Sequence, residues 1–281
     1  MVTATLHGDG KSMDVTEDHT VASLVPLMIA TSLDAGQRPV LQYRESATGK
    51  LLGVLRLTRS ASVTTEKATI TLYYVTAGEH HCLGQPLRAW STRLQNRVML
   101  KNRAPHHFSP EPAAVQQLMI AYLCPRPTIL VSVAAPGHQN IFPMDLIGPL
   151  ERSGLFSLAL RSTSISVPIM RETRKVALSS IPATMKAVVY KLAEQHKHPL
   201  ADWNALPFPV RPSREFGITV PASALRIQEL DIVHSQEVGS HTLFIGRIVS
   251  EENLAEGTQL HHTAGFHQAY RRRKGVPFAE V

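Results

Sequence analysis

The spacing of apolar and polar positions predicts strands in the first part of the chain. Residues 1–20 are polar and show no period, so we expect a frayed lead-in there. Three later segments alternate apolar with polar side chains or are rich in β-branched and aromatic residues, namely 39–44, 51–57 and 68–75. Runs of this kind, separated by turn residues, are typical of β-strands. The N-terminal part is therefore predicted to be β-rich.

A helix and a linker are predicted after these strands. Apolar residues recur at helical spacing over 87–100, which predicts an amphipathic helix. Residues 101–112 contain three prolines, a composition that favours a linker. We place a domain boundary near residue 110. This divides the chain into an N-terminal extension, 1–110, whose role the sequence does not indicate, and a second domain, 111–281.

The second domain is predicted to combine strands with short helices. Its continuous apolar run at 128–135 has the length of a buried strand, and 181–196 carries apolar residues on one helical face. The other predicted elements are a helix or strand entry at 113–123, a turn at 136–139, strands at 155–160, 230–234 and 241–249, a loop at 235–240 and a helix start at 176–178. This pattern favours an α+β, mostly β architecture over a doubly wound sheet. No internal repeat is apparent.

The composition is that of a globular protein. Of 281 residues, 43% are hydrophobic and 18% are charged, which excludes a largely disordered chain. The most apolar early stretch, 21–30, is shorter than the ~18 residues that a membrane helix needs, and acidic residues precede it. Two cysteines cannot form a disulfide framework. We therefore expect a cytoplasmic protein with no membrane span and no export signal.

The chain is basic, with a formal net charge of +7. Four of the basic residues are consecutive, Arg271-Arg272-Arg273-Lys274, and form a basic C-terminal tail. Such charge suits an anionic ligand, a nucleic acid or simple solubility. Few aromatic residues lie among the basic ones, and no nucleic-acid-reading module is recognisable, which argues against a nucleic-acid partner.

Several common kinds of catalytic or metal site are not indicated. The 14 histidines include adjacent pairs such as His106-His107 and His261-His262. Neighbouring side chains on a strand point to opposite faces and chelate poorly without a third ligand, so we expect no metal site. There is no Gly-x-Ser-x-Gly sequence, and no glycine-rich phosphate loop. An intrinsic nicotinamide-binding Rossmann domain is therefore not expected.

Five segments carry a family resemblance through their order along the chain. They are Pro125–Val133, Gln139–Leu146, Leu160–Pro168, Met170–Arg174 and Gly239–Ile248. The series resembles the flavin reductase-like family, the FMN-binding split β-barrel, over roughly residues 115–270. The resemblance implies that barrel in the second domain, an FMN cofactor (with FAD as an alternative), NAD(P)H as a transient co-substrate, and a homodimer. About 110 residues precede it, more than a single barrel needs.

The segment from Asn140 to Leu146 is a candidate for the flavin ring site. FMN presents a planar apolar ring with polar edges and a phosphate, so it needs an apolar wall and nearby hydrogen-bonding groups. We expect a loop made rigid by Pro143, with the Asn140 and Asp145 side chains at the ring edge. The apolar wall would consist of Phe142, Met144 and Leu146. The competing interpretation is a β-turn with buried apolar flanks.

Two further segments are candidates for the phosphate. Residues 162–166 supply four hydroxyls, from which Ser162, Thr163 and Ser164 are the candidate ligands. Arg171, Thr173 and Arg174 precede the predicted helix start at 176–178, where free N–H groups and the helix dipole would favour an anion. A polar edge strand and a solvated charged turn are the respective alternatives.

His241 opens an otherwise apolar strand. A lone histidine in a strand is more often a structural residue whose polar atoms are satisfied. The resemblance instead implies a position beside the flavin and the incoming nicotinamide, and we treat His241 as the candidate catalytic residue. Hydride would pass from NAD(P)H to the flavin, so an oxidoreductase is the first hypothesis. The alternative is a non-catalytic flavin-binding or sensing module on the same fold.

Overall fold

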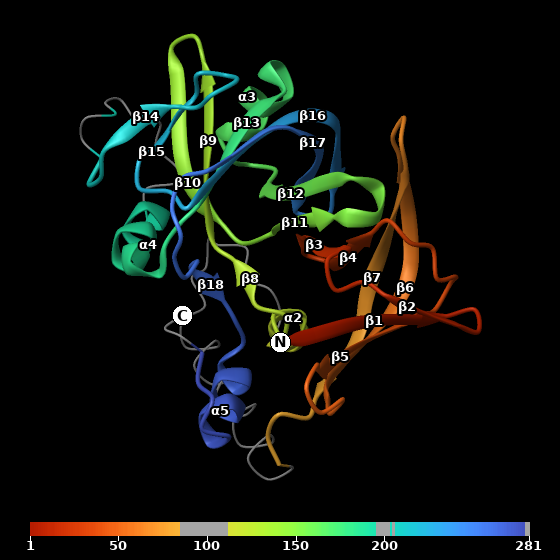
Figure 1. Ribbon diagram of the computed structural model, residues 1–281. Coiled ribbons are helices and arrows are strands. Elements are labelled where there is room, and N and C mark those ends of the chain that lie inside the picture. The colour runs from red at the N-terminus through yellow and green to blue at the C-terminus, as the bar shows by residue number, and fades with distance from the viewer. Residues whose placement is uncertain (85–111, 195–202, 204–205, 279–281) are drawn as a thin grey trace. The chain divides into compact units, whose positions relative to one another are not determined.

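The computed structural model describes residues 1–84, 112–194, 203 and 206–278. They form two compact units, which we call unit 1 (Met1–Pro125 with Thr263–Phe278) and unit 2 (Arg126–His262). The predicted helix at 87–100 and the predicted domain boundary near residue 110 lie outside the described residues. Both units are built mainly from antiparallel strands, as Figure 1 shows.

Unit 1 contains one seven-stranded sheet in the order β2-β1-β5-β6-β7-β4-β3. Its strands are β1 (Val2–Gly8), β2 (Lys11–Asp14), β3 (His19–Leu24), β4 (Leu27–Thr31), β5 (Val40–Glu45), β6 (Leu51–Thr64) and β7 (Thr69–His80). The strands predicted between residues 39 and 75 are confirmed. The prediction of a frayed lead-in over 1–20 is wrong, because alternate residues of β1 are buried and β1 pairs with both β2 and β5.

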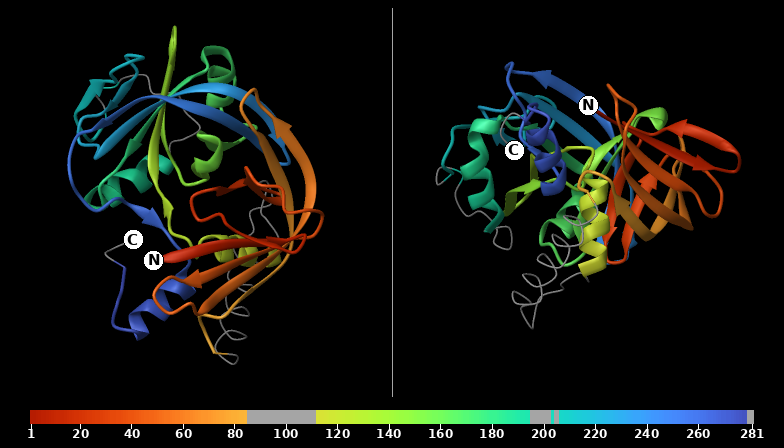
Figure 2. Two further views of the ribbon diagram at one scale, coloured as in Figure 1. Left: turned by 45° about the vertical axis from the view of Figure 1, so that its right-hand side comes forward. Right: turned by 90° about the horizontal axis from the view of Figure 1, so that it is seen from below.

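Two helices belong to unit 1, α2 (Pro112–Ala121) and α5 (Gly265–Arg273). Helix α2 packs on β6 and β7, an arrangement that can be followed in Figure 2. The absence of a side chain at Gly53 permits the segment after α2 to approach the sheet, since a Cβ there would lie 2.4 Å from Leu123 Cδ1. The segment 113–123, for which we predicted either a helix or the start of a strand, is therefore mostly helical.

The basic C-terminal segment of unit 1 is anchored by a carboxylate. Glu45 accepts hydrogen bonds from Tyr270 Oη at 3.3 Å and from Lys274 Nζ at 2.7 Å. The Lys274 and Thr48 side chains lower the pKa of Glu45 to about 2 against the effect of burial. Part of the basic tail is therefore used within the fold.

Unit 2 contains a second seven-stranded sheet, in the order β10-β9-β13-β16-β17-β12-β11. Its strands are β9 (Ile129–Ala135), β10 (His138–Met144), β11 (Ile147–Leu150), β12 (Leu155–Arg161), β13 (Lys175–Ser180), β16 (Arg226–Val238) and β17 (His241–Asn253). Two short ribbons lie outside this sheet, formed by β8 (Arg126–Pro127) with β18 (His261–His262) and by β14 (Val210–Pro212) with β15 (Thr219–Pro221).

The predicted strands of unit 2 are confirmed, although two are longer than predicted. The segment 235–240, predicted as a loop, is mostly paired strand, and the hairpin turns only at Gly239-Ser240, where Gly239 has φ +57°. The polar residues there lie on an extended two-stranded ribbon, so polarity alone did not distinguish strand from loop. The predicted helix at 181–196 is present as α4 (Lys186–Glu194) after a 3₁₀ turn at Ala183–Met185.

Helix α3 (Ser166–Thr173) packs against β9 and β16 and closes the main core of unit 2. Its buried residues Val167, Ile169 and Met170 join the apolar cluster of the sheet, in which Phe244 is fully buried. The helix buries one face because its apolar residues recur at helical spacing. The described chain is thus mostly β with few helices, which confirms the α+β fold class.

Candidate functional site

Two predicted site residues, Ser162 and His241, lie close together where β12 ends and β17 begins. Strands β12 and β17 pair so that Arg161 lies opposite His241. Immediately beyond, Ser162 N–H donates to Ser240 O at 3.2 Å, and Thr242 Oγ1 donates to Ser162 Oγ at 3.2 Å. The hydroxyl-rich segment that follows β12 therefore lies beside the start of β17.

This segment is a turn, as predicted, and not an edge strand. Ser164 N–H donates to Arg161 O at 2.8 Å, which closes the turn. Ser164 Oγ accepts a hydrogen bond from Ser166 N–H at 3.3 Å, at the first residue of α3. Thr163 is exposed between these residues. The turn thus presents hydroxyls at a helix N-terminus, where backbone N–H groups and the helix dipole favour an anion. We call residues 162–165 the serine turn.

The predicted helix start at 176–178 is wrong. Helix α3 ends at Thr173, and the residues from Lys175 onward form β13. The apolar run after Arg174 is a buried strand, a pattern that short sequences share with buried helices. Arg171 and Arg174 therefore lie at the C-terminal end of a helix, where guanidinium groups complement the negative end of the dipole.

The contacts of the three candidate residues at this end are structural. Arg171 forms an exposed ion pair with Glu237 at 3.3 Å. Arg174 has φ +57° and its Nε donates to Ile232 O at 2.7 Å, which ties the helix end to β16. Thr173 Oγ1 donates to Ile169 O at 2.9 Å. The free N–H groups of the helix start, which were expected beside these residues, lie at the serine turn instead.

The segment Asn140–Leu146 is largely a strand rather than the predicted loop. Strand β10 runs at the edge of the sheet, a position that tolerates Pro143. Asn140 is buried, and its Nδ2 donates to Ser166 Oγ at 3.1 Å, which connects β10 to the start of α3. Phe142, Met144 and Leu146 are buried, the first two of them in the main core of unit 2.

Asp145 contacts His262, a partner that the sequence did not predict. His262 Nδ1 lies 2.7 Å from Asp145 Oδ2. The two residues are 117 positions apart, so no local spacing could have shown this pair. Ser166 and Thr242 are likewise hydrogen-bonding partners of predicted site residues that the sequence analysis did not name as ligands. The only available signal was their place next to the predicted residues.

His241 is buried and uncharged at neutral pH. Its side chain is 2% exposed, and Nδ1 lies 2.8 Å from Ser240 Oγ. Burial, and then the positive charge of Arg161, lower the pKa of His241 to about 4. A neutral imidazole can donate or accept a hydrogen bond and pack against a ring, but it does not supply a proton at pH 7.

This buried histidine should make the stability of unit 2 depend on pH. The unfolded residue binds a proton below its ordinary pKa of 6.5, whereas the folded one does so only near 4. Stability is therefore fully present above pH 6.5 and is lost on acidification toward pH 4, by about 3 kcal/mol for this group. Urea denaturation of wild type and His241→Gln at several pH values measures it. The variant should lose less stability over this window, and parallel profiles would contradict the assignment.

Unit 2 is thus an antiparallel sheet with α3 packed on it and the serine turn at the start of that helix, and a family comparison identifies its class. Residues 121–270 match the model of the flavin reductase like domain. The match covers more than half of the chain and all of unit 2, so the chain belongs to this family. The predicted family is thereby confirmed, and with it the split-barrel fold of the second domain.

The chain is also similar to several solved structures. They include the Streptomyces globisporus NADH:FAD oxidoreductase SgcE6, which is 17% identical with a TM-score of 0.48 and covers 58% of this chain and 95% of its own. BorF, the flavin reductase component of a bacterial tryptophan halogenase, is 15% identical with a TM-score of 0.47, covering 54% and 94%. An FMN-binding protein from Thermus thermophilus is 18% identical with a TM-score of 0.44, covering 58% and 97%.

Three further comparisons concern the whole chain or its described part. No curated protein matches the sequence. Among the helices that the structure describes, none has the length and apolarity to cross a bilayer. Within the same residues, no group of three or more His, Cys, Asp or Glu side chains is arranged to hold a metal ion.

Proposed function

We propose that this chain is a flavin reductase-type oxidoreductase that binds FMN in unit 2 and reduces it with NAD(P)H. The observation that carries the proposal is the serine turn at the N-terminus of α3, beside the buried His241, in a domain of the flavin reductase-like family. Hydroxyl and N–H donors of this kind fit the phosphate of FMN. FAD carries a diphosphate at the same position.

The residues of unit 2 bind and orient in this proposal. Ser162 and Ser164 hydroxyls, with the first N–H groups of α3, hold the phosphate, and the exposed Arg161 adds positive charge beside them. Asn140 fixes the start of α3 through Ser166 and so keeps these donors in place. The bound flavin supplies the hydride-accepting chemistry. His241 remains neutral and offers a hydrogen bond and a flat surface, so it positions groups without moving a proton.

We further propose that the flavin is FMN rather than FAD and that NAD(P)H is the transient co-substrate. We also propose that the chain forms a homodimer and is located in the cytoplasm. The apolar side chains of β10 contribute to the wall against which the flavin ring packs. Arg171, Thr173 and Arg174 support the site through the end of α3, and their direct contact with phosphate is not part of the proposal.

The test is anaerobic mixing of the FMN-loaded protein with NADH or NADPH while the visible flavin absorption is followed. Loss of that absorption at a rate that saturates with the nicotinamide concentration is the expected result. A protein that binds FMN yet keeps its absorption with both nucleotides would be a non-catalytic flavin-binding module. A protein that binds no flavin would contradict the proposal entirely.

A further inference from the structure

The two units share one strand order, although the sequence shows no internal repeat. The sheet of unit 1 reads β2-β1-β5-β6-β7-β4-β3, and that of unit 2 reads β10-β9-β13-β16-β17-β12-β11. If the sheet strands are numbered from one within each unit, both orders become 2-1-5-6-7-4-3. Every pairing in both sheets is antiparallel. The strands of each unit can be followed by label in Figure 1.

The agreement extends to the longest strands of each sheet. The sixth and seventh strands form a long hairpin in both units, with 14 and 12 residues in unit 1 and 13 and 13 in unit 2. Each hairpin contains two register shifts. They fall at Arg56/Leu57 and Arg59/Ala61 in unit 1, and at Glu229/Leu230 and Ile232/His234 in unit 2. Such bulges are local features of a particular fold and do not follow from strand pairing in general.

One backbone hydrogen bond is also made at the same place in both sheets. Leu57 N–H donates to Pro39 O at 2.9 Å, and Ile232 N–H donates to Arg174 O at 2.8 Å. In both units the acceptor is the residue directly before the fifth strand, and the donor lies in the sixth strand. A chain that adds each new strand beside the previous one would not place strand 5 next to strand 1 and strand 7 next to strand 4. The shared order is therefore specific.

We propose that unit 1 is a second, diverged copy of the family's split barrel, and that this two-barrel chain holds its flavin in unit 2 alone. The second part of this inference rests on the proposed function. Its evidence lies in the connection between the fourth and fifth strands. In unit 2 this connection, residues 162–174, contains the serine turn and α3. In unit 1 it is the helix-free loop 32–39, all of whose residues the structure describes.

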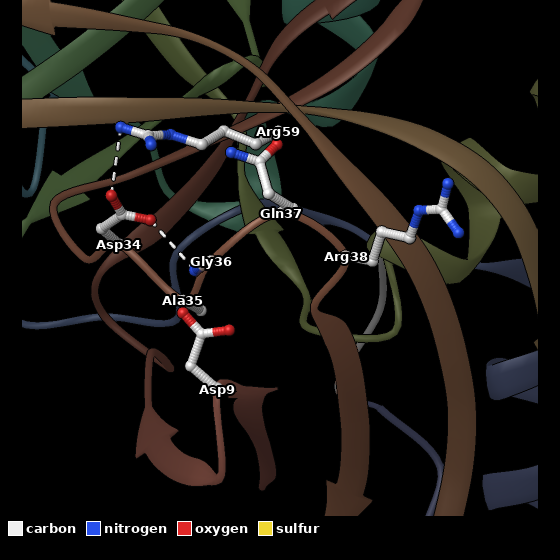
Figure 3. A pocket seen from close by; sticks show the side chains of 7 residues that line it. All are labelled: Asp9, Asp34, Ala35, Gly36, Gln37, Arg38 and Arg59. Carbon is white, nitrogen blue, oxygen red and sulfur yellow. Dashed lines mark hydrogen bonds and ion pairs between the residues drawn. The ribbon is translucent and has the colours of Figure 1, made fainter.

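A cleft of about 510 Å³ lies at this equivalent loop of unit 1. Figure 3 shows its lining residues, Asp9, Asp34, Ala35, Gly36, Gln37, Arg38 and Arg59. Asp9 comes from the β1–β2 turn and Arg59 from β6, the sixth strand of its sheet. The sixth strand of unit 2, β16, packs against α3. The cleft of unit 1 therefore lies at the connection whose counterpart in unit 2 contains the serine turn and α3.

Donors that line the cleft are already engaged by a carboxylate of the chain. Asp34 Oδ2 forms an ion pair with Arg59 at 3.0 Å, and Asp34 Oδ1 accepts the Gly36 N–H at 3.0 Å. The backbone donor and guanidinium that could serve a phosphate therefore already serve a carboxylate of the chain, and Asp9 adds a second negative charge. Arg38 points away from the Asp34–Arg59 pair in Figure 3. The carboxylates of Asp9 and Asp34 balance the charges of Arg38 and Arg59, so the lining offers no net positive charge to a doubly charged phosphate.

The first test counts flavins in the full chain. We expect titration with FMN to saturate at one FMN per chain. Ser164→Asp should weaken FMN binding in unit 2 by about 100-fold, whereas Arg38→Ala/Arg59→Ala in unit 1 should leave the stoichiometry at one FMN per chain and the affinity unchanged within twofold. Two FMN per chain, with half of the binding lost in the unit 1 variant, would overturn the one-flavin inference while leaving the proposed function intact. No binding at all would overturn the proposed function and the one-flavin inference together.

The second test examines the repeat without flavin. Thr5 and Gln42 lie opposite each other on the first and fifth strands of unit 1. Opposed Cα atoms are about 4.5–5.5 Å apart, within disulfide range. The variant Thr5→Cys/Gln42→Cys should therefore cross-link on mild oxidation, while Thr5→Cys/Arg44→Cys, two residues out of register, should cross-link far less. Equal cross-linking, or none in the first variant, would overturn the repeat whatever the flavin content.

Discussion

Replacing Ser164 with aspartate is expected to lower the affinity for FMN by about 100-fold. The Ser164 hydroxyl accepts the Ser166 N–H at the start of α3, a place where aspartate serves the helix equally well. The carboxylate would nevertheless occupy the donors that the account assigns to the phosphate and would repel it. Loss of a hydrogen bond to a charged group costs about 1.5–3 kcal/mol, and ~1.4 kcal/mol corresponds to tenfold in affinity. Quenching of FMN fluorescence during titration measures the effect.

Ser164→Asn is the matched control for this variant. Asparagine has a similar shape and caps helices well, but it carries no charge. It should keep most of the FMN affinity, with a loss of less than about tenfold, which corresponds to roughly one hydrogen bond. The melting temperature of the flavin-free protein should not fall in either variant. Equal losses for aspartate and asparagine would show that the phosphate does not lie at the serine turn.

Replacing Glu229 with alanine is expected to destabilise unit 2 by about 3 kcal/mol or more. Glu229 is 1% exposed and accepts hydrogen bonds from Ser213 Oγ at 2.6 Å, Glu215 N–H at 2.7 Å and Phe216 N–H at 2.8 Å. Burial alone would raise the pKa of Glu229, but these donors outweigh it and lower the pKa. Each donor left unsatisfied after truncation costs about 1–3 kcal/mol. Urea denaturation and proteolysis at residues 213–218 measure the loss.

Glu252→Ala is the control on the same hairpin. Glu252 forms an ion pair with Arg211 at 2.8 Å, with side chains 27% and 35% exposed. A partly exposed pair of this kind contributes about 0.2–1 kcal/mol. The Glu229 variant should therefore be less stable than the Glu252 variant. Similar stabilities would mean that the segment 213–218 does not depend on the buried carboxylate.

The lowered pKa of Glu229 also determines how the stability contributed by this residue changes with pH. Its contribution is present above the ordinary pKa of the carboxyl group and is lost as the pH falls through the folded value. The difference in stability between wild type and Glu229→Ala should therefore shrink on acidification.

The strands with the strongest apolar character were predictable from the sequence. Residues 129–135 and 155–161 are nearly all apolar and buried, so their composition alone indicated strands. Strand β1 was missed because only Val2, Ala4 and Leu6 are buried, while threonine and histidine occupy its other face. A three-residue apolar pattern beside polar neighbours is too short to stand out from a loop.

The site was predictable in part, for a different physical reason in each case. The turn at 162–165 was predictable because clustered hydroxyls favour turns, whereas His241 was singled out only through the family resemblance. Helix α3 was missed because Pro168 and the hydroxyls looked like loop, although proline is tolerated in a first helical turn. Arg171 and Arg174 were assigned to the start of a helix, whereas they lie at the end of α3.

Contacts between residues far apart along the chain could not be predicted from the sequence alone. The contact between Asp145 and His262 joins residues far apart along the chain. The common strand order of units 1 and 2 likewise depends on pairings between distant strands, which local composition does not encode. Repetition of a fold can therefore persist after sequence similarity between the copies has disappeared.

Comparison of FMN with riboflavin tests the central claim most directly, since riboflavin has the same ring and ribityl chain without the phosphate. If the serine turn of unit 2 holds the phosphate, the wild-type chain binds FMN at least about tenfold more tightly than riboflavin, because charge-assisted hydrogen bonds contribute ~1.5–3 kcal/mol. Ser164→Asp should remove this preference. Equal affinities of the wild-type chain for the two flavins, or no binding of either, would contradict the account.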